Sequence, residues 1–366
     1  MIFTQQNGEN KVKKEEKVCG IKTSIGGQAL MEGIMMRGPK RTAMAVRNPQ
    51  GEIVVEEWDT KTSNRAKIFK LPIIRGVFNF ADSMIVGYKC LMRSAEISGL
   101  EEIEEEERRA KAAKKAAKAA KKAEKRGEPI PEATIEEKVE EENKEDKKED
   151  KKEGSVMMTM IMAVSIVLAL VLVVGLFFWL PTFLYGLLSK LIPAIDGNRF
   201  AQSGFETVIR LVLLVGYMAL VSLMKDIRRT FMYHGAEHKT IFCYEQGLEL
   251  TVENVRKQQR FHPRCGTSFL IIMVLVGLIV SFFIPTAIPR IARVAIKLAC
   301  IPLIMGIGYE LIKIAGRHDN IVTRIISAPG MWLQRITTVE PDDDMIECAI
   351  VAVKKVIPDD GSDKIG

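Results

Sequence analysis

Apolar residues are gathered into long runs along this chain, and charged residues are gathered into other long runs. The overall composition is 47% hydrophobic and 27% charged, but no single segment has this average composition. The first hundred residues alternate short polar and apolar stretches, whereas the second half contains runs long enough to span a bilayer. This division predicts a polytopic α-helical membrane protein with a small α+β unit at its N-terminal end.

The N-terminal unit is expected over residues 20–100, after a polar, disordered tail at 1–19. Two β-rich stretches, TAMAVRN and EIVVEEW, flank the turn sequence Asn48-Pro49-Gln50-Gly51 and predict two neighbouring strands. Several glycines precede them in IGGQALMEGIMMRGPKR. No phosphate-binding spacing such as GxGxxG is present, so tight bends or close packing explain these glycines better than a phosphate cradle.

Residues 71–99 have the periodicity of a helix, with Pro72 near the start and Gly99 near the end. Four charged residues interrupt the apolar positions, and each would cost about 2.5–3.5 kcal/mol near the centre of a bilayer. We therefore expect an amphipathic helix that packs on the β unit or lies on the membrane surface. The following segment, 101–153, is a charged low-complexity insertion, expected to form a solvated helix and a linker.

Four transmembrane helices are predicted within residues 154–318, using the criterion of about 20 apolar residues for a span. They cover about 155–181, 203–224, 266–289 and 292–314. The fourth span has the weakest signal, because Arg293 and Lys297 lie near one end and Glu310 lies near the other.

The loop at 225–265 is rich in Lys and Arg, whereas the loop between the first two spans offers only Lys190 and Arg199. The positive-inside rule then places the 225–265 loop and both termini in the cytoplasm. The lipid bilayer is therefore the expected partner. The net charge of +7 raises nucleic-acid binding as an alternative, but no recognition motif supports it, so no nucleic-acid partner is expected.

The stretch FMYHGAEHKTIFCY (231–244) carries the strongest candidate chemistry. On a helix, His234, Glu237 and His238 fall within a sector of about 100°, so both imidazoles can reach one ion. The order H-x-x-E-H also occurs in inverted zinc hydrolases, in which the glutamate activates water. The alternative is the ordinary polar end of a helix.

Topology adds three further candidate ligands, because the predicted spans bring FHPRCGTSF, with His262 and Cys265, to the same membrane face. Glu310 is an acid within a predicted span and is therefore also a candidate. Each of these residues has an alternative role. Cys265 could be an inert buried thiol or a nucleophile, and Glu310 could only pair with a base such as Lys313.

The segment 319–366 is expected to be a cytoplasmic loop followed by an amphipathic helix. Pro341 and the acidic run Asp342–Asp344 favour a helix start there. The apolar stripe of this helix would consist of Ile346, Ala349, Ile350 and Val353. The six cysteines show no pairing rhythm, and we expect them to be reduced.

Three motifs together, GGQALMEGIMMRGP, HGAEHK…HPRCGTSF and PGMWLQRITTVEPDDDMIE, resemble the YqhQ-like family of bacterial membrane proteins. The resemblance covers about 20–100 and 155–356 and leaves out the charged insertion. It implies an inner-membrane protein and a predicted metal-dependent enzyme, but it supplies no substrate.

These observations lead to one principal hypothesis, a metal-dependent hydrolase whose site faces the cytoplasm. His234 and His238 would be ligands of a divalent transition metal, most simply zinc, and His262 with Cys265 or Glu310 would complete the site. Glu237 would act as the general base. A non-enzymatic scaffold that recruits cytoplasmic proteins is the alternative and a transporter is a third hypothesis, while a homo-oligomer stays open.

Overall fold

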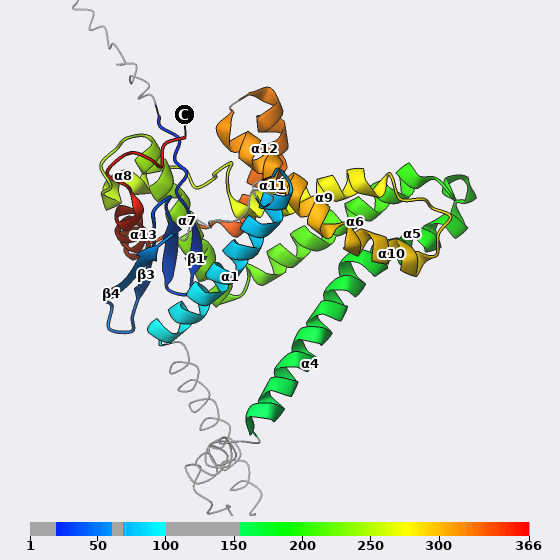
Figure 1. Cartoon of the computed structure of the whole chain (residues 1–366), viewed down its shortest axis with the longest axis horizontal. Coiled ribbons are helices and arrows are strands. Elements are labelled where there is room, and N and C mark those ends of the chain that lie inside the picture. The colour runs from blue at the N-terminus through cyan, green and yellow to red at the C-terminus, as the bar shows by residue number, and fades with distance from the viewer. Residues whose placement is uncertain (1–19, 61–68, 70, 100–153, 319, 366) are drawn as a thin grey trace, which may run out of the picture.

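A computed structural model describes residues 20–60, 69, 71–99, 154–318 and 320–365 of the chain. The predicted N-terminal tail and nearly all of the charged insertion lie outside these residues. The described chain is mostly helical and contains one small antiparallel sheet near its N-terminal end. In Figure 1 the sheet lies at one end of the molecule and the most apolar helices lie at the other.

The sheet is a four-stranded meander with the order β1-β2-β3-β4. Its strands are β1 (Gly26–Leu30), β2 (Gly33–Arg37), β3 (Arg41–Arg47) and β4 (Ile53–Asp59). The two predicted strands are confirmed as β3 and β4, and the glycine-rich stretch forms the β1–β2 hairpin. A Cβ atom on Gly33 would lie 2.4 Å from the carbonyl oxygen of Ala45, so this glycine permits close packing of the strands.

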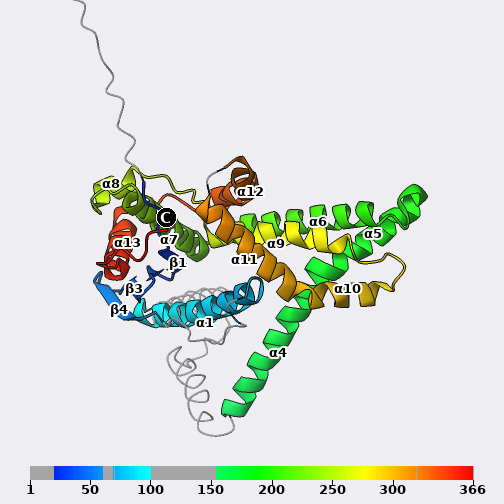
Figure 2. The same cartoon turned by 45° about the horizontal axis from the view of Figure 1, so that its top comes forward.

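Helices cover both faces of the sheet. One face packs against α7 (Lys225–Glu245) and α13 (Asp343–Val356), and α8 (Val252–Arg256) packs on these two helices and adds to the larger apolar core. The other face packs against α1 (Ile74–Ile97), with Leu30, Met44 and Cys90 in the interface. Figure 2 shows α1 on the opposite side of the strands from α13. The sheet is therefore the middle layer of a three-layer unit.

The expected helix at 71–99 is confirmed as α1, which packs on the β unit, one of the two arrangements expected for it. Its N-terminal part also contacts α11 (Ile301–Arg317), because a Cβ atom on Gly76 would lie only 2.8 Å from Cβ of Tyr309. Helix α1 thus links the sheet unit to the apolar helices.

The apolar helices form the second part of the molecule. They comprise α4 (Gly154–Val174), η2 (Gly175–Trp179), α5 (Leu180–Leu191), η3 (Pro193–Ile195), α6 (Arg199–Val221), α9 (Gly266–Ser281), α10 (Arg290–Ala299) and α11. Helix α4 projects away from the others, and only its C-terminal end meets them (Figure 1).

Two helices in the described chain are long and apolar enough to cross a membrane, Ala163–Leu191 and Arg199–Val221. A third crossing is available if α10 and α11, which meet at a bend of 45°, form one broken span. Pro302 lies in the first turn of α11. A proline is tolerated at the start of a helix, but it disfavours a continuous helix that would join α10 to α11. Helix α9 is apolar throughout but has only 16 residues. Two or three helices of the described chain therefore qualify as candidate spans by length and composition, and the predicted number of four is not confirmed.

The tail contains one more helix than the sequence predicted. Residues 321–337, expected to be a loop, form α12 (Ile321–Thr337), which begins at a capping box made by Asn320 and Thr323. Pro329 lies inside this helix, a position that a proline usually disfavours. Helix α12 packs against α9, where Gly330 lies so close to Ser268 that a Cβ atom would clash with it. The predicted helix after the acidic run is confirmed as α13, with its apolar stripe buried.

Candidate metal centre

Three potential metal ligands converge at the junction between α7 and the start of α9. The ligating atoms of His234, His238 and Cys265 lie within 4.8 Å of one another. The Nε2 atom of His234 is 3.1 Å from Sγ of Cys265, and the two imidazole rings are 4.4 Å apart between centroids. Helical spacing of four residues on α7 brings the two histidines together, while the cysteine comes from the residue that caps α9.

Backbone carbonyl groups fix the orientation of both histidines. The Nδ1 atom of His234 lies 2.8 Å from the carbonyl oxygen of Thr337, at the end of α12. The Nδ1 atom of His238 lies 2.5 Å from the carbonyl oxygen of Arg260. A carbonyl oxygen can only accept a hydrogen bond, so each Nδ1 carries a proton. Histidines that ligate metals commonly donate one ring N–H in this way, which leaves Nε2 available for the ion.

Cys265 lies where a thiolate is favoured. Burial raises its pKa, but the positive charges of His234 and His238 outweigh that effect and lower it well below the ordinary value. The backbone N–H of Thr267, in the first turn of α9, also donates to Sγ over 3.4 Å. Burial lowers the pKa of His234, and the neighbouring Cys265 reverses this effect and raises it to about 9. Without a metal, the two groups therefore form a thiolate–imidazolium pair at neutral pH.

Glu237 lies beside these ligands on the same helix and is buried. Its Oε1 atom accepts a hydrogen bond of 3.0 Å from the backbone N–H of Gly27, in β1. Burial raises the pKa of the carboxyl group, and the two histidines offset this effect only in part. A carboxyl group with a raised pKa can exchange a proton closer to neutral pH than an exposed glutamate can.

A cavity of about 510 Å³ reaches all four residues. Its wall combines β1, α7 and the start of α9, so the sheet unit closes the site on one side. This volume lies within the range of about 300–1,000 Å³ that is typical of small-molecule sites.

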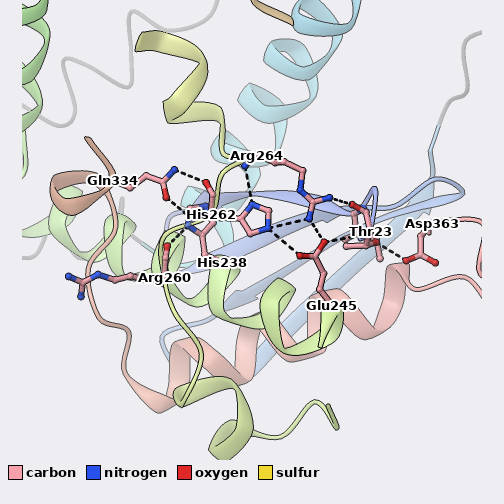
Figure 3. A network of polar contacts seen from close by, with 9 residues as sticks. Thr23, His238, Glu245, Arg260, His262, Arg264, Gln334 and Asp363 are labelled. Atoms are coloured by element: carbon pink, nitrogen blue, oxygen red, sulfur yellow. Dashed lines mark hydrogen bonds and ion pairs between the residues drawn. The ribbon is translucent and has the colours of Figure 1, made fainter. Parts of the chain in front are cut away.

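The third histidine of the region, His262, lies next to His238, with 5.6 Å between the ring centroids. It does not point at the ligand group. Its Nε2 atom faces Oε2 of Glu245 at 3.6 Å, and Nη2 of Arg264 lies 3.4 Å away (Figure 3). His262 therefore belongs to a polar network behind the ligands, made with Glu245 and Arg264.

Glu310 lies away from the three ligands. It forms a two-point ion pair with Arg75 of α1, in which Nε of Arg75 donates to Oε1 over 2.7 Å. This is the ion-pair alternative considered for Glu310, but with Arg75 as the partner in place of Lys313. His318, at the end of α11, lines a neighbouring cavity.

Gln334 is an important residue of the site that the sequence did not reveal. Its side chain is fully buried and clamps the backbone of His262, accepting from the N–H and donating to the carbonyl oxygen, each over 2.7 Å (Figure 3). It also reaches Ser268 of α9 at 3.2 Å. The motif PGMWLQRITTVE contains this residue, but nothing in its spacing indicates contact with a segment 72 positions earlier.

The donor set fits zinc. Two imidazole nitrogens and one thiolate are ligands that zinc prefers, and zinc–ligand distances of about 2.0–2.3 Å are compatible with donor atoms this close together. Structural zinc sites use four protein ligands, whereas catalytic sites use three and keep a position open. The described residues offer three potential ligands, His234, His238 and Cys265, with the carboxyl group of Glu237 beside them.

Comparison with known proteins identifies the family. The family described as "Protein of unknown function (DUF1385)" matches residues 71–359. "Uncharacterized protein YqhQ" of Bacillus subtilis (strain 168) is 32% identical over 341 residues, covering 91% of this chain and 92% of that protein. No solved structure matches the chain. The chain therefore belongs to the DUF1385 family and is a relative of YqhQ, as its three motifs indicated.

Proposed function

We propose that this protein is a membrane-bound zinc hydrolase whose site is formed by His234, His238 and Cys265. The observation that carries the proposal is the convergence of these three donor atoms within 4.8 Å, beside a buried glutamate. A zinc ion held there would act as a Lewis acid, the chemistry by which hydrolytic zinc sites activate water and polarise carbonyl or phosphoryl groups.

The protein's own residues supply positioning and proton transfer. The carbonyl groups of Thr337 and Arg260 hold the two imidazoles in the tautomer that presents Nε2. The N–H of Gly27 holds one oxygen of Glu237, which leaves the other to take a proton from water and return it to the leaving group. The raised pKa of this carboxyl group makes its ionised form a stronger base toward water than an exposed glutamate.

We further propose that the apolar helices cross the bacterial inner membrane four times, with α9 and the bent α10–α11 pair as the third and fourth crossings. The basic loop at 225–265 and both termini would then be cytoplasmic. In this arrangement the three-layer unit and the metal centre lie on the cytoplasmic face, next to the ends of the spans.

Elemental analysis of the purified, detergent-solubilised protein tests the metal centre. The wild type is expected to contain close to one zinc per chain, and His234→Ala/His238→Ala is expected to contain almost none. His318→Ala is the matched control, since this histidine lies outside the ligand group. A wild type that is metal-free and takes up no added zinc would sink the proposal, and a non-enzymatic scaffold would then explain the cluster better.

A further inference from the structure

A second, larger cavity adjoins the metal centre and has a different chemical character. Its volume is about 830 Å³, and it extends from the end of α7 to the face of α12. His262 and Arg264 line both this cavity and the smaller cavity at the metal centre. The two cavities therefore share a wall, made by the segment that supplies the ligand Cys265.

The lining of the larger cavity combines basic side chains with apolar ones. Four of its lining residues are basic and one is acidic, and the acid, Glu245, is already held by Arg264. Aromatic and aliphatic groups supply much of the remaining wall. The basic lining residues are Lys22, Arg264, Arg324 and Arg335, and the large apolar ones include Phe261, Met331 and Trp332.

Helix α12, which forms one side of this cavity, presents an apolar face outward. Four large apolar side chains on it are 53–75% exposed: Ile321, Val322, Ile325 and Trp332. At about 100° per residue they occupy a sector of about 100°, and Arg324 and Arg335 lie along one edge of it. Exposed apolar residues flanked by arginine and tryptophan are typical of a helix that lies in a membrane interface.

The same helix supports the metal centre from its other face. Gln334 clamps the backbone of His262, and the carbonyl group of Thr337 orients His234. Helix α12 also packs against α9 and α11, two of the helices assigned to the bilayer. One element thus joins the lipid-facing surface, the basic cavity and the zinc ligands.

We propose that the cavity along α12 binds an anionic amphiphile, a lipid with a phosphate-bearing headgroup, from the cytoplasmic leaflet. Arg324 and Arg335 would bind the phosphate group. The apolar residues around Trp332 would contact the part of the acyl chain nearest to the headgroup. A membrane lipid fits better than a soluble acidic peptide, because the apolar face of α12 adjoins the bilayer helices. Two parts of this inference rest on the proposed function, namely that the lipid comes from the cytoplasmic leaflet and that it is the substrate of the metal centre. That an anionic lipid binds this cavity rests on the cavity and on α12 alone.

Binding can be measured with full-length protein reconstituted in phosphatidylcholine nanodiscs. The variant Trp58→Phe/Trp179→Phe leaves Trp332 as the single tryptophan of the chain, so its fluorescence reports on the cavity. The probes are a short-chain phosphatidic acid, the matching short-chain phosphatidylcholine and inorganic phosphate. We expect saturable binding of phosphatidic acid, and at least about tenfold weaker binding of the other two probes.

In the same background, Arg324→Gln/Arg335→Gln should weaken phosphatidic acid binding by about tenfold. The matched control is Lys354→Gln/Lys355→Gln, which removes two exposed charges at the end of α13 and should leave binding unchanged. Equal binding of phosphatidylcholine, full competition by inorganic phosphate, or no effect of the arginine changes would each overturn the proposal. Zinc content is measured on the same samples. Lipid binding by a protein that neither contains zinc nor takes up added zinc would reject the proposed hydrolase but uphold the lipid site.

Discussion

His234 Nε2 lies 3.1 Å from Cys265 Sγ, although 31 residues separate the two in the chain. The first belongs to a helix packed on a β-sheet, and the second caps an apolar helix. Their contact joins the two parts of the molecule, so a metal held between them would also fix how the sheet unit meets the apolar helices. Metal binding is therefore expected to stabilise the junction as well as to create the site.

The first prediction concerns the state of Cys265 in metal-free protein. Its lowered pKa means that the thiolate persists at neutral pH and takes up a proton only in acid. Because the pKa of His234 is raised to about 9, the imidazolium partner is present below that pH and lost above it. Ultraviolet absorbance of the thiolate should thus be visible at neutral pH in the wild type.

The control for this measurement is Cys265→Ser, which leaves the other cysteines in place and should lose the neutral-pH signal. Burial raises the pKa of Cys90, Cys243 and Cys348, so these three contribute little. In His234→Ala the thiolate should appear only at more alkaline pH. Identical spectra of wild type and Cys265→Ser at neutral pH would contradict the thiolate–imidazolium pair.

The second prediction compares two adjacent glycines in β1. A Cβ atom at Gly27 would lie 2.7 Å from the carbonyl oxygen of Met35 and 3.0 Å from Cδ of Glu237, whereas one at Gly26 would meet nothing within 4 Å. Gly27→Ala should destabilise the protein by about 1–3 kcal/mol through overpacking, and Gly26→Ala should change stability by less than about 1 kcal/mol. The midpoint of thermal unfolding in detergent measures both. Equal midpoints would show that the β1–Glu237 contact is looser than described.

Local periodicity explains which parts of the site could be predicted. His234, Glu237 and His238 share one face of α7 because a single helix places them there, and the sequence alone gives that geometry. Cys265 could be proposed as a ligand because its motif precedes an apolar run, but which of Cys265, His262 and Glu310 would join the histidines was not determined by spacing.

Tertiary contacts explain what could not be predicted. Glu310 is paired by Arg75, a residue 235 positions away, and no local pattern marks that contact. The helix at 321–337 was not predicted, because adjacent Pro329 and Gly330 are typical of a loop. In the structure Gly330 lies within the helix, where the absence of a side chain permits close packing against Ser268. Hydropathy alone also does not register that α9 has only 16 residues or that α10 and α11 meet at a bend, so it gives no sign of which predicted spans are continuous helices.

The third prediction separates the two roles considered for Glu310. If this residue serves as an ion-pair partner for Arg75, Glu310→Gln should retain the zinc content of the wild type. The exchange should lower the free energy of unfolding by about 1 kcal/mol, since the pair is only partly buried. His238→Ala is the positive control for metal loss. Loss of zinc in Glu310→Gln would mean that this carboxylate reaches the ion after all.

The last prediction concerns Glu206, a fully buried carboxylate of α6 that neutralises a cluster of basic groups among the apolar helices. It accepts from Thr182 over 3.0 Å, and it pairs with Arg210 at 3.1 Å and with Lys297 of α10. Removing one member of a buried ion pair leaves uncompensated charge in a medium of low polarity, which costs about 3–5 kcal/mol. Glu206→Gln should therefore lower the midpoint of thermal unfolding strongly.

A second variant distinguishes charge from packing. Glu206→Gln/Lys297→Met removes the unpaired ammonium group as well and should recover part of the lost stability, because an apolar side chain of similar length replaces a buried charge. Glu253→Gln, at an exposed ion pair with Lys257, should leave the midpoint unchanged. Two outcomes would contradict this role of Glu206 in compensating the buried positive charge of α6 and α10. One is a Glu206→Gln variant as stable as Glu253→Gln, and the other is a Glu206→Gln/Lys297→Met variant less stable than Glu206→Gln.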